Sequence, residues 1–501
     1  MKPNQLKLFK IIVPVFLLLF MTCKEAPKSA ENLYPETELP VSTSSDEAMA
    51  AFVSGLEAAD LGQARMAREL FDKALELDPN FVSAQMYRTF NSTSWKEFGD
   101  NRQKLLAMKD KANESEKMQI DQLEANINRN TSEVLEIDKK LTEKYPNSAR
   151  ALTNMAATYQ GMDQTEKARE LLSKALELNP VFIPAINGLG TSYLFVAPKD
   201  FKKAEKYMAK VVDMYPDNSK THINLGDCYR AQKDLEKALA SYLKAAELDP
   251  KDDVAFSKAG HANTFLGNFE EARKNYQDAR AVSEFGIGSF NFEALTFLYE
   301  GDYSKTLAFF EDFAGKVQSM DIPESIKTST KMNCTSNCAT IAMHYGDADL
   351  LKKQVERMKP LSESLVADVG SESIARNQKV NLLQWEAFAS AVEGNFADAA
   401  AKAEEIKMIV EPLDDPLKLR PFNQIHAFVN FEQGNYNEAL QYMASLDQDD
   451  VYNKYWIAKA NHKAGNKDKA MAMFQEIADD NFNSTEYALV RNEVKEILSK
   501  G

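Results

Sequence analysis

The sequence predicts an all-α protein, a solenoid of about a dozen helix–turn–helix pairs, and three observations lead to this fold class. Pro146, Pro180, Pro216 and Pro250 recur at intervals of 34, 36 and 34 residues, and a period of this length is typical of helical-repeat solenoids. The 19 glycines and 17 prolines make up about 7% of the 501 residues, against roughly 12% on average, so helix breakers are scarce. No run of alternating β-branched residues is long enough to indicate a sheet.

Residues 219–252 show the layout of one repeat most clearly. Gly226 in a first helix and Ala238 in a second are small residues, placed where the two helices are expected to approach most closely. The other marker residues at helical spacing are Leu225, Tyr229, Tyr242 and Ala245. Pro250 ends the second helix, because proline cannot continue the ladder of backbone hydrogen bonds.

The same layout recurs in four other stretches, residues 48–81, 149–182, 183–218 and 253–286. Each has a small residue in the first helix and alanine with a large apolar residue in the second, and most end in proline. This pattern resembles the tetratricopeptide repeat (TPR). The resemblance implies a right-handed superhelical solenoid, with regular repeats over residues 48–286.

Residues 287–501 repeat less regularly, and residues 82–148 fit two degenerate pairs. Glycines that begin polar turns between helical stretches are Gly301, Gly346, Gly394, Gly434 and Gly465. The spacing between these glycines varies, so the helices or their connections differ in length. We therefore expect a divergent solenoid over residues 287–501, with a capping helix near residues 485–500.

The first 22 residues have the pattern of a secretory signal peptide. Three lysines precede an apolar run over residues 11–21, which is shorter than the roughly 20 residues that span a bilayer. Cys23 follows, and the junction resembles a bacterial lipoprotein signal of the Bacteroidota type, although Phe20 and Thr22 depart from the usual motif. The resemblance implies acylation of Cys23, and the alternative is an ordinary secreted protein cleaved nearby.

Residues 23–47 carry three prolines and many Ser, Thr and Glu residues, which indicates a disordered tether behind the acylated cysteine. The lipoprotein resemblance, together with Lys24 after the cysteine, implies attachment to the outer membrane, on the periplasmic or the surface side. Without residues 1–22 the chain has 57 basic and 75 acidic residues, a net charge of −18. This charge argues against a nucleic-acid partner.

The sequence contains no recognisable set of catalytic or metal-ligating residues, so we expect no enzyme, no cofactor and no metal. The five histidines are scattered, and Cys228 falls in a repeat helix as a small core residue. Cys334 and Cys338 lie four residues apart. For this pair, core packing is favoured over a disulfide or a metal site with His344. Asp414 and Asp415 form the one carboxylate pair that a hidden hydrolase could use, and a solvated turn is the simpler interpretation.

Binding is the expected function, because the first helices of TPR pairs line the concave face. Carried onto this chain, the resemblance implies ten lining residues: Arg150, Thr153, Asn187, Thr191, Lys220, Asp227, Arg230, Ser257, His261 and Thr264. Phe195 and Phe265 are expected to add aromatic contacts. The main hypothesis is a membrane-anchored scaffold that binds a protein or peptide partner in the bacterial cell envelope. The alternative is an outer-membrane lipoprotein that captures carbohydrate or another nutrient through Trp95, Trp385 or Trp456.

Overall fold

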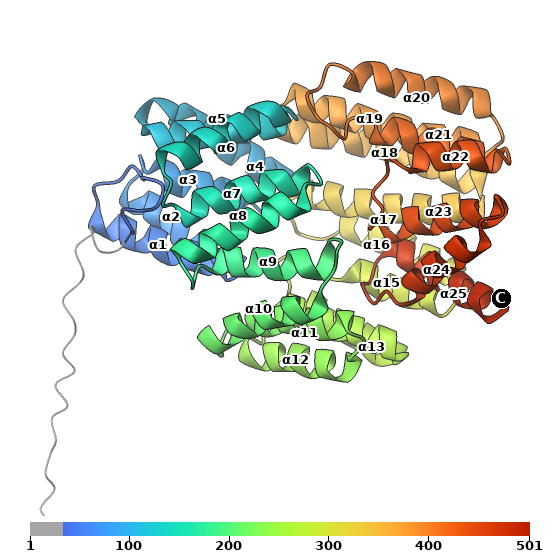
Figure 1. Cartoon of the computed structure of the whole chain (residues 1–501), viewed down its shortest axis with the longest axis horizontal. Helices are drawn as coiled ribbons and strands as arrows, with labels where there is room; N and C mark the ends of the chain where they lie inside the picture. The colour runs from blue at the N-terminus through green and yellow to red at the C-terminus, as the bar shows by residue number, and fades with distance from the viewer. Residues whose placement is uncertain (1–33, 501) are drawn as a thin grey trace, which may run out of the picture.

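The computed structural model describes residues 34–500, and within this range it contains 25 α-helices, one 3₁₀ turn and no strand (Figure 1). The predicted all-α fold class is confirmed. Residues 1–33 and residue 501 lie outside the described range, and so do the predicted signal peptide and Cys23.

The helices form twelve consecutive pairs and one closing helix. The first seven pairs are α1 (Asp46–Asp60) and α2 (Ala64–Leu77), α3 (Val82–Phe90) and α4 (Trp95–Ala107), α5 (Glu114–Ile127) and α6 (Thr131–Lys144), α7 (Ala149–Gly161) and α8 (Thr165–Leu178), α9 (Ile183–Phe195) and α10 (Phe201–Met214), α11 (Ser219–Ala231) and α12 (Leu235–Leu248), and α13 (Asp253–Leu266) and α14 (Phe269–Val282). The last five are α15 (Phe290–Tyr299) and α16 (Tyr303–Gln318), α17 (Glu324–Tyr345) and α18 (Ala348–Val369), α19 (Glu372–Val392) and α20 (Phe396–Val410), α21 (Arg420–Glu432) and α22 (Tyr436–Met443), and α23 (Val451–Lys463) and α24 (Lys467–Ala478). The closing helix is α25 (Thr485–Lys500), and the 3₁₀ turn η2 (Lys109–Lys111) follows α4.

The recurring prolines lie where the sequence predicts that helices end. Pro146, Pro180, Pro216 and Pro250 each stand two residues after the last residue of α6, α8, α10 and α12. In the later units the turns begin with glycine, and Gly301, Gly346, Gly394, Gly434 and Gly465 all have φ between 72° and 93°. Glycine adopts this left-handed conformation without steric cost, which explains why it recurs there.

The two helices of a pair touch where the sequence has its small residues. A Cβ atom on Gly226 of α11 would lie 2.5 Å from Cε1 of Tyr242 in α12, and one on Gly260 of α13 would lie 2.4 Å from Cε1 of Tyr276 in α14. Both tyrosines are fully buried. The small first-helix residue and the aromatic second-helix residue are therefore a single packing unit.

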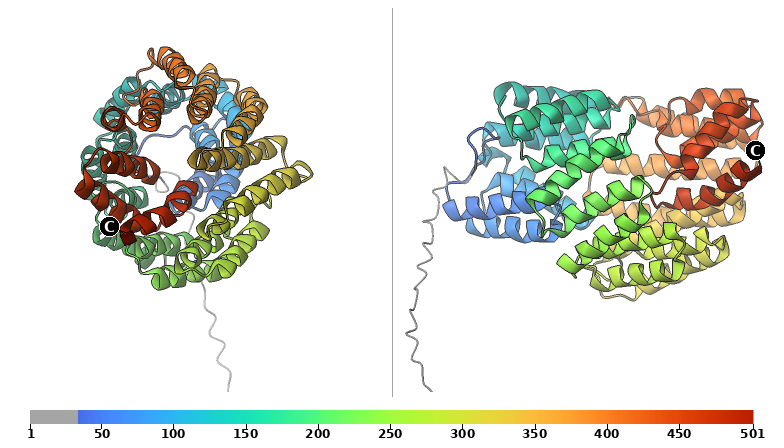
Figure 2. Two further views of the ribbon diagram at one scale, coloured as in Figure 1. Left: turned by 90° about the vertical axis from the view of Figure 1, so that its right-hand side faces the viewer. Right: turned by 60° about the horizontal axis from the view of Figure 1, so that its bottom comes forward.

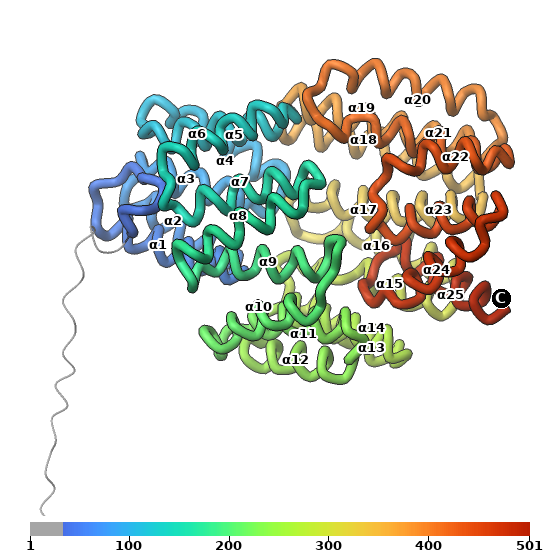
Figure 3. Tube along the Cα trace, viewed as in Figure 1, coloured from blue at the N-terminus to red at the C-terminus, as the bar shows by residue number. Residues whose placement is uncertain are grey.

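The pairs follow a curved path, so that later units come to lie beside earlier ones (Figures 2 and 3). Helix α4 packs on α18, and a Cβ on Gly99 would lie 2.7 Å from the carbonyl oxygen of Asp368. The start of α6 meets the loop before α21, where the Thr131 amide donates to the Asp414 carbonyl at 2.9 Å. We call this line of contacts between distant units the seam.

Residues 34–45 do not behave as the disordered tether predicted for residues 23–47. The Glu38 carboxylate accepts a hydrogen bond of 2.6 Å from the Ser148 hydroxyl, and the Thr43 hydroxyl donates to Asp78 at 2.6 Å. Leu39 is buried in a cluster with Ile137, Leu141 and Ala151. The prediction is thus corrected for residues 34–45, because these polar and apolar contacts fix the segment against the end of α2, the start of α7 and the second half of α6.

Candidate functional site

Three of the predicted groove residues are covered by the turn between α1 and α2. Arg150 forms an ion pair with Asp60, with N–O distances of 2.7 and 3.1 Å, and the Asn187 amide donates to the Asp60 carbonyl at 3.5 Å. Lys220 pairs with Asp252 at 2.5 Å, and its Cγ lies 3.6 Å from where a Cβ on Gly62 would be. The first helix pair therefore fills part of the concave face that the sequence predicts to be open.

Five more predicted residues are buried in α11 and α13, and all but Ser257 belong to a polar network with Tyr242 and Tyr276. They are Asp227, Arg230, Ser257, His261 and Thr264. Asp227 accepts hydrogen bonds from the Tyr242 hydroxyl at 2.7 Å and from Lys258 Nζ at 2.8 Å. Burial raises the pKa of Asp227, but the positive charges of Lys258 and Arg230 outweigh this and hold the pKa below its usual value.

The His261 ring contacts the Tyr276 hydroxyl at 2.9 Å, and burial lowers the pKa of His261 well below its usual value. Thr153 and Thr191 bond back to carbonyls of their own helices. Phe265 is buried, whereas Phe195 packs against Phe482 at 4.8 Å. Eight of the ten predicted lining residues are therefore covered or buried by other parts of the chain, whereas Thr153 is partly exposed and Thr191 is exposed. Their role in binding a partner stays a prediction.

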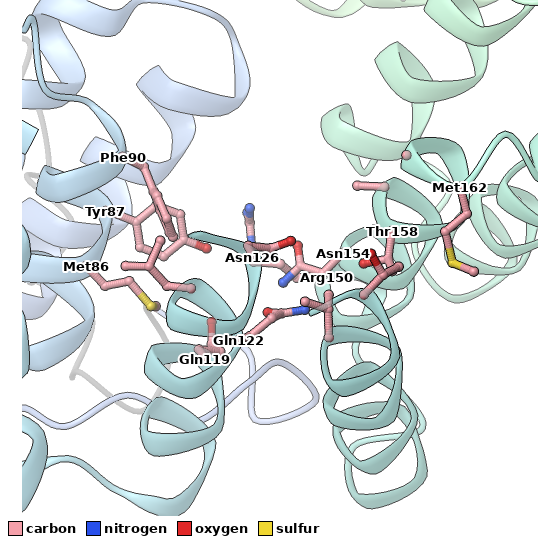
Figure 4. Close-up of a pocket in the computed structure, with 15 residues that line it drawn as sticks. Met86, Tyr87, Phe90, Gln119, Gln122, Asn126, Arg150, Asn154, Thr158 and Met162 are labelled. Carbon is pink, nitrogen blue, oxygen red and sulfur yellow. The ribbon is translucent and has the colours of Figure 1, made fainter. Parts of the chain in front are cut away.

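The concave face stays open further toward the N-terminus, at a cavity of about 450 Å³ between α3, α5 and α7 (Figure 4). These are the first helices of three successive pairs, as the TPR resemblance implies. The cavity is lined by Met86, Tyr87 and Phe90 from α3, by Gln119, Gln122 and Asn126 from α5, and by Arg150, Asn154, Thr158 and Met162 from α7 and its end. We call this cavity the amide groove. Of this set the sequence predicts only Arg150. The residues of α3 and α5 lie in the degenerate repeats of residues 82–148, and the other residues of α7 and its end lie in a regular repeat but outside its marker positions.

A buried carboxylate organises one side of the amide groove. Asp138 of α6 is fully buried and accepts a 2.6 Å hydrogen bond from the Gln122 amide and another of 2.6 Å from the Thr158 hydroxyl. Both donors line the groove. Burial raises the pKa of Asp138 to about 6. Asp138 therefore holds side chains of two different helices in fixed orientations.

Two amides of the groove have no hydrogen-bond partner within residues 34–500. They are the side chains of Asn126, which is exposed, and Asn154, which is half-buried. Figure 4 shows both between the aromatic side chains of α3 and the far end of α7. Phe90 is 54% exposed at the edge, and the charge of Arg150 is balanced by Asp60. An amide both donates and accepts, so the groove matches the N–H and C=O groups of an extended backbone.

Within the part of the chain that the structure describes, the thiols are buried and the side chains that could ligate a metal are dispersed. No group of three or more His, Cys, Asp or Glu side chains within residues 34–500 could hold a metal ion. Cys228, Cys334 and Cys338 are buried free thiols, and burial raises the pKa of each to about 12. The favoured interpretation of Cys334 and Cys338 as core residues agrees with this.

Asp414 and Asp415 lie in the seam, where the Asp414 carboxylate accepts from the Ser132 amide at 3.0 Å and Asp415 pairs with Arg129. Both carboxylates are thus engaged in contacts that join distant units across the seam. Trp385 and Trp456 are partly buried against the core, while Trp95 is 50% exposed. Among the helices of the described range, none has both the length and the apolar character that a membrane span needs.

Family models agree with this geometry. Models described as tetratricopeptide repeat match residues 47–81, 149–182, 219–252 and 430–493. These four segments are tetratricopeptide repeats, and together they make up about a third of the chain. The last match lies in the region where the sequence predicts only divergent repeats. TPR arrays act as scaffolds for interactions between proteins, since each stacked unit adds to one extended binding surface.

Individual relatives resemble only parts of the chain. It is 25% identical over 195 residues to tetratricopeptide repeat protein 6 of Homo sapiens, covering 31% of this chain and 38% of the relative. It is 25% identical over 157 residues to anaphase-promoting complex subunit 3 of Schizosaccharomyces pombe, covering 31% and 23%. Among solved structures, it is similar to a chain in the crystal structure of the APC/C hetero-tetramer Cut9–Hcn1, with 13% identity and a TM-score of 0.35. The match covers 90% of this chain and 76% of that chain. The chain spans less than two fifths of either curated relative.

Proposed function

We propose that this chain binds an extended peptide segment of a partner protein in the amide groove. The observation that carries the proposal is the pair of unpartnered amides, Asn126 and Asn154, on neighbouring helices of a preformed concave surface. A peptide backbone would supply the missing donors and acceptors, and a partner's apolar side chain would pack on Phe90. Because Asp138 already fixes Gln122 and Thr158, little side-chain freedom would be lost on binding.

The groove has no unpaired cation or anion among its lining residues, since Arg150 is already paired with Asp60. Recognition would therefore depend on backbone amides and apolar contacts more than on charge. The partner segment would be extended and neutral at its centre, with an aromatic or aliphatic residue opposite Phe90.

The test is a peptide-display selection against the purified chain, followed by titration of the selected peptides. The double substitution Asn126→Ala and Asn154→Ala should weaken binding by about 10-fold or more, because each lost hydrogen bond contributes roughly 0.5–1.5 kcal/mol. Asn224→Ala is the matched control, since Asn224 is an amide of α11 outside the groove. Equal affinities for the double variant and the control would contradict the proposal.

We also propose that the scaffold acts in the bacterial cell envelope, held to the outer membrane by a lipid on Cys23. The support is the sequence of residues 1–23, with its basic start, its short apolar run and its cysteine. Mass spectrometry of the N-terminal peptide from isolated membranes tests this. A diacylated or triacylated Cys23 is the expected result, and an unmodified N-terminus in the soluble fraction would contradict it.

A further inference from the structure

A short non-helical stretch near the C-terminus packs against first helices of the repeat pairs. Residues 479–484 connect α24 to α25 and have no helical structure over residues 480–484. The Phe482 ring lies 4.8 Å from the Phe195 ring of α9 and 4.6 Å from the Arg230 guanidinium of α11. This stretch, the 479–484 segment, thus crosses the first helices of two pairs, as a bound peptide would.

Its next residue is held by specific hydrogen bonds. The Asn483 amide donates to the Tyr276 hydroxyl at 3.1 Å and contacts His261 Nδ1 at 3.2 Å, and its oxygen accepts from the Tyr299 hydroxyl at 3.0 Å. Burial keeps His261 neutral, so this ring can accept the amide proton. The ring of Phe482 and the amide of Asn483 are therefore contacted by side chains of five different helices, α9, α11, α13, α14 and α15.

The surface beneath the segment has hydrogen-bond donors that the segment leaves without an acceptor. Arg230 is 2% exposed, and its Nη2 donates to Asp227 at 3.1 Å. Its Nε and Nη1 find no partner within the described chain. Lys258 uses the same Asp227 carboxylate. The buried Arg230 and the partly buried Lys258 thus share one carboxylate, and buried N–H groups of a guanidinium without an acceptor carry a large energetic cost.

The segment's own carboxylates leave these N–H groups unpaired. Asp480 forms no ion pair with Arg230 and instead accepts a 2.8 Å hydrogen bond from the Phe482 amide. Asp479 pairs with Lys233, and both side chains are about half exposed, so this pair contributes little. The direct link to α24 keeps both aspartates where they are. A separate peptide with the same residues would be free to shift one carboxylate onto Arg230.

We propose that this surface is a second binding site, for an extended partner segment that combines a carboxylate, an aromatic residue and an amide, and that the 479–484 segment covers it until such a partner displaces it. The partner's aromatic ring would take the place between Phe195 and Arg230, its amide would replace Asn483, and its carboxylate would accept from Nε and Nη1 of Arg230. That last contact is the one the chain's own segment does not make, and charged hydrogen bonds to arginine are among the strongest.

Displacement requires no unfolding of the helices. A cavity of about 390 Å³ beside Phe482 is lined partly by the segment itself and by Lys199, Phe201 and Lys454. Release of the segment would open this cavity toward Arg230. The site is separate from the amide groove, and the two proposals do not depend on each other.

The test measures the binding of a fluorescein-labelled peptide with the sequence of residues 478–485 to the full chain. The unmodified chain should bind it weakly, because its own segment competes at a high effective concentration. The variant with Phe482→Ala and Asn483→Ala should bind it at least about 10-fold more tightly. A peptide with alanine at the phenylalanine position should not bind, and one with asparagine for both aspartates should lose about 10-fold, because it cannot pair with Arg230. Equal affinities of the three peptides for the variant would overturn the proposal. Equal affinities of the variant and the unmodified chain for the unaltered peptide would overturn it as well.

A second measurement uses the unmodified chain and does not depend on the folding of a variant. Hydrogen–deuterium exchange should show the amides of residues 481–484 exchanging at least about 10-fold faster than those of α24 and α25, because the segment opens on its own. Exchange at the same rate as the two helices would overturn the proposal. The variant with Asn126→Ala and Asn154→Ala should behave as the unmodified chain in both measurements, which separates this site from the amide groove.

Discussion

At the scale of single residues, the molecule depends on a few places where only one side chain fits. Gly226 leaves no room for a Cβ beside Tyr242, and the tyrosine hydroxyl in turn bonds Asp227. The sequence predicts this contact, because the glycine and the tyrosine recur at fixed positions in several repeats. It does not predict the partners of Asp227, since those come from the curvature of the whole array.

Gly226→Leu should lower the free energy of unfolding by about 1–3 kcal/mol, because the added side chain overpacks the contact with Tyr242. Thermal or urea denaturation measures this. Gly315→Ala is the control, since nothing lies within 4 Å of a Cβ at this position in α16. The control should be neutral or stabilising by roughly 0.5–1 kcal/mol, because alanine favours helix more than glycine. A destabilised control and an unchanged Gly226 variant would contradict this packing.

Asp138 should make stability depend on pH. Its pKa in the folded chain is about 6, against 3.8 for an ordinary aspartate, because burial disfavours its charged form. The folded state therefore loses stability as pH rises from about 4 to about 6, by up to roughly 3 kcal/mol, and the loss stays constant above that range. Asp138→Asn removes the titrating carboxyl group. The free energy of unfolding of the variant should therefore rise relative to that of the wild type as the pH is raised from 4 to 7. A stability difference that does not change with pH would contradict the assignment.

At the scale of helices and pairs, most of the architecture follows from the sequence. The prolines two residues after α6, α8, α10 and α12, and the glycines with positive φ in the later turns, are visible as a pattern. The amide groove is less visible in the sequence, because its helices α3 and α5 lack the repeat's marker residues. An indication was present in the unusual number of amides at helical spacing, Gln119, Gln122 and Asn126.

The closing helix α25 should be required for a soluble fold. Its Tyr487, Val490 and Val494 are almost fully buried against the last units, which would otherwise expose their apolar faces. Deletion of residues 485–501 should cause aggregation or a clear loss of the cooperative thermal transition, because terminal repeats need a capping element. Removal of residues 499–501 alone should have little effect. Size-exclusion chromatography and calorimetry measure both, and a monomeric truncated chain of unchanged stability would contradict the capping role.

At the scale of the whole molecule, curvature decides which surfaces are free. The repeat pattern specifies how each pair packs on the next, but small rotations between units add up to a path that returns on itself. This path brings the α1–α2 turn onto Arg150 and Asn187 and the 479–484 segment onto Arg230. The sequence therefore identifies the residues of the first helices correctly and still overestimates how many of them are open to a partner.

In the seam, we expect the packing of α4 on α18 to depend on the absence of a side chain at Gly99. Gly99→Val should push α4 away from α18, because the new side chain would meet the Asp368 carbonyl oxygen. We expect a larger radius of gyration in small-angle X-ray scattering, with unchanged helix content in circular dichroism. Gly315→Ala again serves as the control. An unchanged radius for Gly99→Val would mean that the two units do not pack as described.

The central claim is that the amide groove holds a partner's peptide, and site-specific photo-crosslinking tests it most directly. A benzoylphenylalanine at position 90, on the exposed edge of the groove, would be activated in intact cells and the crosslinked products identified by mass spectrometry. We expect a discrete partner protein joined through an extended segment, lost when Asn126→Ala and Asn154→Ala are added. The same probe at the similarly exposed Tyr303 of α16 should not capture it. Identical products at both positions, or a product that persists in the double variant, would contradict the account.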